Sequence, residues 1–267
     1  MGVSQELIDA ARAVEAATSV AASVLIAVAI VETNARAFAP VGDRLEPLIR
    51  FEGHYFDRRL EPDARRKARS LGLAHPSAGA VKNPAGQAAR WAMLERASAI
   101  HRAKAYESTS WGLAQVMGAH WPQLGFQSAE ALAEMARGSV AGQLTIAARF
   151  LTEGSLGGLL LAGDHAGFAR RYNGPAFAGN HYDTKIAGAH AKALRLLGVP
   201  SVLRLGARGE AVVELQRALT ARGFALVADG LFGPRTEQAV RALQAACDLV
   251  VDGIAGPRTL GALGAPT

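Results

Sequence analysis

Near its C-terminal end the chain repeats an eight-residue pattern at an offset of 23 residues, from 229 to 252. Residues 229–236 read DGLFGPRT and residues 252–259 read DGIAGPRT. Asp-Gly predicts a tight turn with a residue at positive φ. Gly-Pro predicts a helix start, because proline in the first helical turn loses no hydrogen bond. Apolar residues at helical spacing before and between the copies predict further short helices: Val212, Leu215, Leu219, Val240 and Leu243.

This repeat predicts a compact three-helix unit of roughly the minimum size that folds alone. The whole chain has 267 residues, which is enough for one large domain and one small one. A short segment rich in helix-breaking residues, Gly-Val-Pro-Ser at 198–201, separates two parts of the chain that differ in composition. We therefore expect a first domain over 1–197, a linker over 198–202 and a second domain over 203–267.

The first domain is expected to be mainly α. Apolar residues recur at helical spacing from Leu7 to Val31, which predicts one long amphipathic helix with a buried end. Similar patterns predict helices over 129–135, 140–152 and 185–197. No run alternates between polar and apolar residues for long, so little strand is expected.

Composition excludes several classes of protein. Only 19% of the residues are charged, which argues against disorder. A net charge of +6 suits an anionic polymer without choosing among nucleic acid, a membrane surface and cell wall. Cys247 is the single cysteine, so an intrachain disulfide is excluded. Because the sequence lacks a Cys/His cluster of zinc-finger type, we expect neither a metal nor a cofactor.

The N-terminal residues do not resemble a secretory signal. Glu6, Asp9 and Glu15 outnumber Arg12 there, whereas a signal peptide begins basic and then turns apolar. The apolar run over 20–31 is too short to span a bilayer. These features predict synthesis in the cytoplasm and no stable membrane insertion.

Residues 203–264 resemble the peptidoglycan-binding family 1 domain. The match includes the segment 205–209, Gly223-Phe224, both Asp-Gly turns and Leu243-Gln244. Cys247-Asp248 departs from the small residue or glycine that the family usually has. The resemblance implies binding to peptide stems or glycan of the bacterial wall, without assigning contact residues. The alternative is a three-helix spacer that binds nothing.

A wall-cutting domain would need a carboxylic acid that stays protonated. Cleaving a glycosidic bond requires a proton donor for the leaving oxygen, and burial favours the neutral carboxyl. Glu32 fits this requirement because it lies four residues after Val28, at the end of the longest apolar stripe.

Three segments, in family order, resemble goose-type lysozymes and lytic transglycosylases. Residues 26–33 look like their helix followed by Glu-Ser, with Thr33 in place of serine. Residues 110–118 (SWGLAQVMG) resemble their Ser-x-Gly-Leu-x-Gln-x-Met segment. Residues 172–175 (YNGP), with Tyr182 and Lys185, resemble their Tyr-Asn-Gly element and the tyrosine after it. Residues 51–56 (FEGHYF) make the chain more similar to the N-acetylmuramidase family common in phage endolysins. That resemblance covers about residues 7–197 and implies a lysozyme-like fold.

The resemblance and the chemistry together suggest roles. Glu32 is expected to be the general acid. Glu52 is expected to be a second carboxylate that orients water or stabilises the oxocarbenium-like transition state, with His54 tuning it. Trp111 or Tyr182 is a candidate for stacking on a sugar ring. The remaining predicted substrate contacts are His54, Ser110, Gln115, Met117, Tyr172 and Asn173.

Alternatives stay open for several of these residues. Glu32 could merely cap or ion-pair a helix end. Glu52 could be a structural partner of His54 or an arginine, or it could itself be the acid. Glu107 is a third candidate acid, and Trp111 suits the core as well as a sugar platform.

The function implied is hydrolysis of the β-1,4 bond between N-acetylmuramic acid and N-acetylglucosamine. The family habit implies holin-dependent release, after which the protein acts in periplasm and wall. A monomer is expected because two linked sites already give avidity on a polymer, and nucleic acid is not an expected partner. One rival is a lytic transglycosylase, and another is a non-catalytic wall-binding phage protein. A zinc amidase or peptidase is disfavoured because the seven histidines contain no His-x-His pair. A thiol amidase is disfavoured because Cys247 lies in the binding domain.

Overall fold

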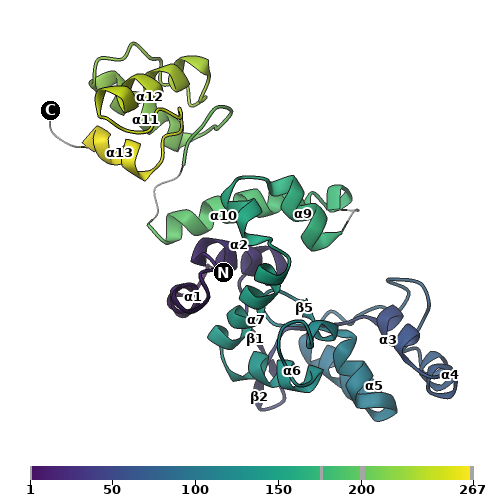
Figure 1. The fold of residues 1–267 in the computed structure, drawn as a ribbon. Coiled ribbons are helices and arrows are strands. Elements are labelled where there is room, and N and C mark those ends of the chain that lie inside the picture. Colours follow the sequence, from purple (N-terminus) through teal and green to yellow (C-terminus); the bar gives the residue numbers. More distant parts are fainter. Residues whose placement is uncertain (1, 175–176, 199–201, 265–267) are drawn as a thin grey trace. The chain divides into compact units, whose positions relative to one another are not determined.

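The computed structural model describes residues 2–174, 177–198 and 202–264. Over these residues it contains thirteen α-helices and five short strands, so the prediction of a mainly α protein is confirmed (Figure 1). The chain divides into two compact units, Met1–Ala193 and Leu194–Thr267. Part of the predicted linker over 198–202, namely 199–201, lies outside the described residues.

The N-terminal apolar stripe forms two helices, so the prediction of one long helix was wrong. Helix α1 (Gln5–Thr18) ends where Ser19 takes a left-handed conformation with φ 62°, and α2 (Ala22–Thr33) follows. A left-handed residue cannot continue a right-handed helix. The apolar periodicity runs through the break because both helices bury residues in the same unit, and α2 is buried on nearly all sides.

Helices pack around α2 on several sides. Helix α7 (Val140–Glu153) contacts both α1 and α2, and it follows α6 (Ala129–Gly138) directly. Ser139 separates these two helices, and its hydroxyl caps α7 by accepting from the Gly142 amide at 2.9 Å. Helix α10 (Tyr182–Leu196) lies beside α2, where His190 Nε2 and Ser23 Oγ are 3.1 Å apart (Figure 1).

Two small antiparallel sheets complete the first unit. Strands β1 (Phe38–Val41) and β2 (Arg44–Pro47) form a hairpin. Strands β3 (Ile49–Phe51), β4 (Thr109–Trp111) and β5 (Val116–Met117) form a second sheet in that order. Each strand has four residues or fewer, which is too short for a sustained alternation in the sequence.

The remaining elements connect these layers. Helix α5 contacts β3 and β4, and α3 and α4 lie between β3 and α5 in the chain. Their bounds are α3 (Gly53–Arg59), α4 (Pro62–Ser70), α5 (Gln87–Glu107), the 3-10 helix η1 (Gly118–His120), α8 (Gly157–Leu161), α9 (His165–Asn173) and the 3-10 helix η2 (Phe177–Asn180).

The second unit contains α11 (Glu210–Ala221), α12 (Pro234–Ala246) and α13 (Pro257–Gly264), which contact one another pairwise. Its core is a single apolar cluster that includes Leu215 and Phe232. Isolated β-bridges join Leu203 to Ala255 and Arg208 to Leu231, so the segment before α11 pairs with both repeat copies.

The two repeat copies are held by the same hydrogen bonds. In the first copy, buried Gln216 donates from Nε2 to Asp229, the Leu231 carbonyl and Thr236 at 2.8, 3.0 and 3.1 Å. Its Oε1 accepts from the Gly230 amide at 3.0 Å.

Gln244 makes the corresponding contacts in the second copy. Its Nε2 donates to Asp252, the Ile254 carbonyl and Thr259 at 2.8, 3.0 and 3.1 Å, and its Oε1 accepts from the Gly253 amide at 2.9 Å. Each buried amide therefore fixes one Asp-Gly turn to the helix that precedes it.

The described residues contain no helix that is long and apolar enough to cross a membrane. Among the same residues no group of three or more His, Cys, Asp or Glu side chains is arranged to hold a metal ion.

Candidate active site

One groove of about 640 Å³ in the first unit contains both predicted catalytic glutamates. Glu32 reaches it from the end of α2 and Glu52 from the end of β3. Five of the predicted substrate contacts also line it, namely Ser110, Gln115, Met117, Tyr172 and Asn173. The groove thus brings together segments that lie far apart in the sequence.

The Glu32 carboxyl lies in a largely buried environment. Burial raises its pKa, and the opposing influences are a hydrogen bond from Tyr182 and the positive charge of Arg50. The Tyr182 hydroxyl donates to Glu32 Oε1 at 2.6 Å. Because desolvation is the largest influence, the neutral, proton-carrying form of Glu32 is favoured relative to an exposed glutamate.

A stack of aromatic rings supports this carboxyl. The Tyr172 ring stacks on Phe168 at 5.2 Å and on Tyr182 at 6.0 Å between centroids. The Tyr172 hydroxyl donates to the Ala114 carbonyl at 2.7 Å. Burial raises the pKa of both tyrosines, so both hydroxyls stay protonated. Tyr182 is only 4% exposed, which places it behind Glu32 and not on a surface where a sugar ring could stack.

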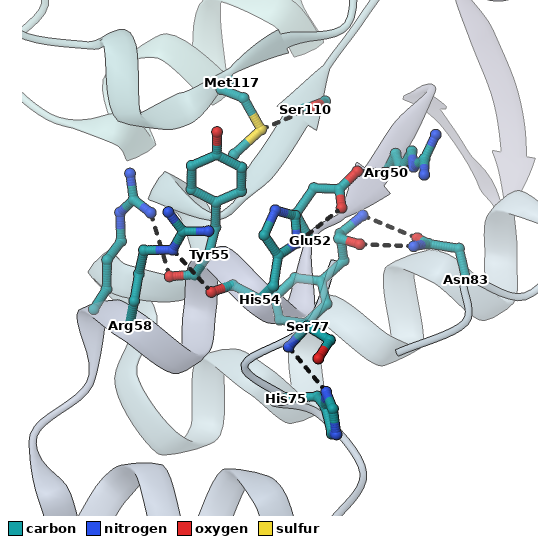
Figure 2. Close-up of polar contacts among 12 residues, drawn as sticks. Arg50, Glu52, His54, Tyr55, Arg58, His75, Ser77, Asn83, Ser110 and Met117 are labelled. Carbon is teal, nitrogen blue, oxygen red and sulfur yellow. Dashed lines mark hydrogen bonds and ion pairs between the residues drawn. The ribbon is translucent and has the colours of Figure 1, made fainter. Parts of the chain in front are cut away.

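Glu52 has a different environment, in which arginine and histidine neighbours surround its carboxylate (Figure 2). Arg50 Nε lies 2.8 Å from Glu52 Oε1, and His54 Nδ1 lies 3.5 Å from Oε2. The Glu52 side chain remains 17% exposed toward the groove. Glu52 thus has a basic side chain within 4 Å of each carboxylate oxygen.

His54 lies beside Glu52 but does not line the groove. Its Nδ1 is buried and has no hydrogen-bond partner in the described structure. Burial lowers its pKa, and the nearby Arg58, Arg50 and Arg59 lower it further, whereas Glu52 raises it. A neutral imidazole next to Glu52 is therefore favoured, which agrees with a positioning role better than with direct sugar contact.

The chain around Glu52 is held by side chains that continue the β3 sheet edge (Figure 2). Asn83 accepts from the Phe51 amide at 2.9 Å and donates to the Phe51 carbonyl at 2.7 Å, as a neighbouring strand would. The Glu52 amide donates to the Ser108 carbonyl at 2.8 Å. A Cβ on Gly53 would lie 2.5 Å from the Val81 side chain, so only glycine allows this close approach.

Trp111 occupies the core and not the groove, so the prediction that it contacts sugar is not supported. It is 1% exposed, and its ring meets Trp91 edge-on at 5.8 Å. Its Nε1 donates to the Tyr106 carbonyl at 3.2 Å. The physical reason is that β4 is the middle strand of its sheet, with both faces covered.

Other residues of the SWGLAQVM motif shape the groove wall. Gln115 has φ 48°, and its Nε2 donates to the Leu48 and Gly112 carbonyls at 3.2 and 2.8 Å. Ser110 donates to the Met117 sulfur at 3.1 Å. These contacts hold β4 and β5 in a fixed arrangement beside the glutamates.

Glu107 is not a groove residue. Its carboxylate lies 3.0 Å from Lys104 Nζ and 3.5 Å from Arg59 Nε. It is absent from the lining that Glu32 and Glu52 share, which leaves these two as the candidate acids.

Sequence reasoning missed several groove residues, among them Arg50, Tyr55, His120 and Phe150. Arg50 was detectable in principle, because it stands between the apolar residues Ile49 and Phe51 of a short strand. The His120 and Phe150 rings lie 5.0 Å apart across 30 residues of sequence, and no local pattern marks that pair.

With this geometry established, comparison with known proteins places the chain. Residues 21–194 match the sequence profile of the N-acetylmuramidase family. The chain belongs to that family. Its second unit matches the peptidoglycan-binding domain family over residues 208–263, so the muramidase domain is followed by a wall-binding domain.

Solved structures extend this result. A crystal structure of a Burkholderia AP3 phage endolysin is 33% identical, covers 71% of this muramidase chain and 70% of its own, and has a TM-score of 0.60. The SleB N-terminal domain is 43% identical over 24% of this chain and 89% of its own, with a TM-score of 0.24. A search of curated proteins finds no match.

Proposed function

We propose that this muramidase hydrolyses the β-1,4 bond between N-acetylmuramic acid and N-acetylglucosamine, with Glu32 as general acid. The observation that carries the proposal is the contrast between two carboxyls in one groove. Glu32 is desolvated, with its pKa raised, whereas Glu52 is paired with Arg50 at 2.8 Å. Glycoside hydrolysis uses one carboxyl that carries a proton for the leaving oxygen and a second carboxyl group close to it.

The hydrogen bond from Tyr182 defines which oxygen of Glu32 reacts. Because the hydroxyl donates to Oε1, that oxygen acts as an acceptor and Oε2 is left to carry the proton. Oε2 then protonates the leaving glycosidic oxygen. The carboxylate that results is stabilised by the Tyr182 hydroxyl and the charge of Arg50, the two groups that already oppose the desolvation.

Glu52 supplies the second carboxylate function. It orients the attacking water or stabilises the positive charge that develops on the sugar ring. Arg50 forms an ion pair with its Oε1, and neutral His54 lies against its other oxygen. Gln115, Tyr172 and Asn173 line the same groove and are proposed to contact N-acetyl or hydroxyl groups.

The products distinguish hydrolysis from transglycosylation. A second usable carboxylate favours attack by water, which leaves a reducing muramic acid end. Mass spectrometry of digested peptidoglycan should therefore show reducing ends. Anhydro-muramic ends as the main product would reject the hydrolase assignment and support the transglycosylase alternative.

We further propose that the protein acts as a monomeric endolysin, reaching periplasm and wall from the host cytoplasm when a holin opens the membrane. The structural likeness to a phage endolysin supports this role. Peptidoglycan is the proposed partner, and nucleic acid is not. Expression in the cytoplasm with and without a holin tests it, because lysis is expected only with the holin. Light scattering of the purified chain should give a monomer mass.

A further inference from the structure

The second unit contains a groove of about 490 Å³ beside the second Asp-Gly turn. It is separate from the Glu32 groove and lies within the wall-binding domain. Val202 borders it next to the bridge that joins Leu203 to Ala255. The other lining residues are Gln244, Asp248, Leu249, Val250, Asp252, Ile254, Gly256, Arg258 and Thr259.

The groove has a rigid floor. Gln244, Asp252 and Thr259 belong to the hydrogen-bonded lock of the second turn, so their polar atoms already have protein partners. A preformed floor lowers the entropic cost of binding a ligand above it.

The rim of the groove combines exposed apolar side chains with three charged ones, of which Asp252 already accepts hydrogen bonds from Gln244 and the Ile254 amide. Val250 is 77% exposed, and Val202 is exposed as well. Asp248, in a left-handed conformation with φ 52°, and Arg258 are exposed lining residues. Within the described parts of the chain, neither of these two side chains is engaged by an ion pair. Both are therefore available to a ligand.

We infer that this groove binds the stem peptide of peptidoglycan and not its glycan strand. The inference rests on the proposed function, in that it takes peptidoglycan as the substrate. A stem peptide carries free carboxylates, alanine methyl groups and a diamino acid with an ammonium group. Arg258 matches a carboxylate, Asp248 matches the ammonium and the valines match the methyl groups. No residue that lines the groove is aromatic, whereas aromatic faces are the usual contact for sugar rings.

The internal repeat provides matched controls. Arg235 and Val227 stand 23 residues before Arg258 and Val250, which is the offset of the repeat, and both lie outside this groove. In the full-length chain with Glu32→Gln, which leaves the wall uncut, we expect Arg258→Glu and Val250→Asp each to weaken sedimentation with insoluble peptidoglycan. The expected loss of affinity is about tenfold or more for the charge reversal. Arg235→Glu and Val227→Asp should change affinity less than about twofold.

Competition identifies the occupant. Soluble stem peptide should displace the parent chain from the wall, and glycan strands stripped of peptide by an amidase should not. Displacement by stripped strands alone, or equal losses in all four variants, would overturn the inference. Thermal unfolding checks that each variant is folded. If Val250→Asp unfolds the unit, the test rests on Arg258→Glu. Product analysis with native Glu32 is independent of this assay, so failure of the groove and failure of the muramidase assignment are distinguishable.

Discussion

The muramidase unit and the wall-binding unit differ in how far along the chain their decisive polar contacts reach. The hydrogen bond from Tyr182 to Glu32 joins residues 150 positions apart. The bond from Gln244 to Asp252 joins residues 8 positions apart. A site built from distant segments depends on the whole unit, whereas each locked turn is bonded to the helix before it and to the threonine in the first turn of the helix after it.

The comparison also concerns what burial does to a polar group. In the wall-binding unit, the buried amides of Gln216 and Gln244 have partners for both ends, so burial strengthens the fold. In the muramidase unit, the buried carboxyl of Glu32 has one donor and its pKa is raised. Burial there favours the protonated carboxyl at the expense of stability.

The largest expected effect is the loss of wall cleavage in Glu32→Gln. An amide cannot donate the proton that the leaving oxygen needs, so activity should fall by about 10³-fold or more. Clearing of a suspension of cell walls measures it, and the variant should still sediment with peptidoglycan. Glu107→Gln is the matched control, because Glu107 lies outside the groove. Full activity in Glu32→Gln would transfer the acid role to Glu52.

The next effect tests whether the two turns are equivalent. Gln216→Ala and Gln244→Ala each remove the same four hydrogen bonds from a buried amide, so each should destabilise the wall-binding unit by about 2–4 kcal/mol. Hydrogen exchange followed by mass spectrometry should show faster exchange over 202–264 and unchanged exchange over the muramidase unit. A much smaller effect of one variant would show that the copies are not energetically alike.

A smaller effect is expected in Tyr182→Phe. The hydrogen bond from Tyr182 lowers the pKa of Glu32, so its removal should raise that pKa further. Since the acid must be protonated, the alkaline limb of the pH–activity profile should move to higher pH. The loss of a donor to the product carboxylate should lower kcat by about tenfold. A profile that stays in place would mean that Glu32 does not set that limb.

The smallest effect concerns stability. A carboxyl whose pKa is raised by folding favours the native state below its unfolded pKa, and that advantage disappears as the pH rises through the folded pKa. At pH values above the pKa that Glu32 has in the folded protein, Glu32→Gln should therefore stabilise the muramidase unit, by about 1 kcal/mol or less. Chemical denaturation at acidic and alkaline pH measures it, and a stabilisation confined to acidic pH would contradict the assignment.

Features that depend on a local pattern were predictable from the sequence, and features that depend on distant contacts were not. The Asp-Gly turns, their helices and the positions of Glu32 and Glu52 were all predictable, because each depends on a local pattern or a short motif. The break at Ser19 was not, since the apolar periodicity continues across it. The burial of Trp111 and the pairing of His120 with Phe150 depend on contacts between distant segments, which no local pattern records.

The dependence of Glu32 on Tyr182 has a consequence for synthesis. While the ribosome is still translating, the helix α2, which carries Glu32, emerges long before α10 does. A nascent chain therefore lacks the donor to Oε1 until residue 182 and the helix that carries it have left the exit tunnel. The hydrogen bond to the proposed acid therefore forms at nearly the last step of making the muramidase unit, so an incomplete translation product carries both glutamates without the hydroxyl that contacts one of them.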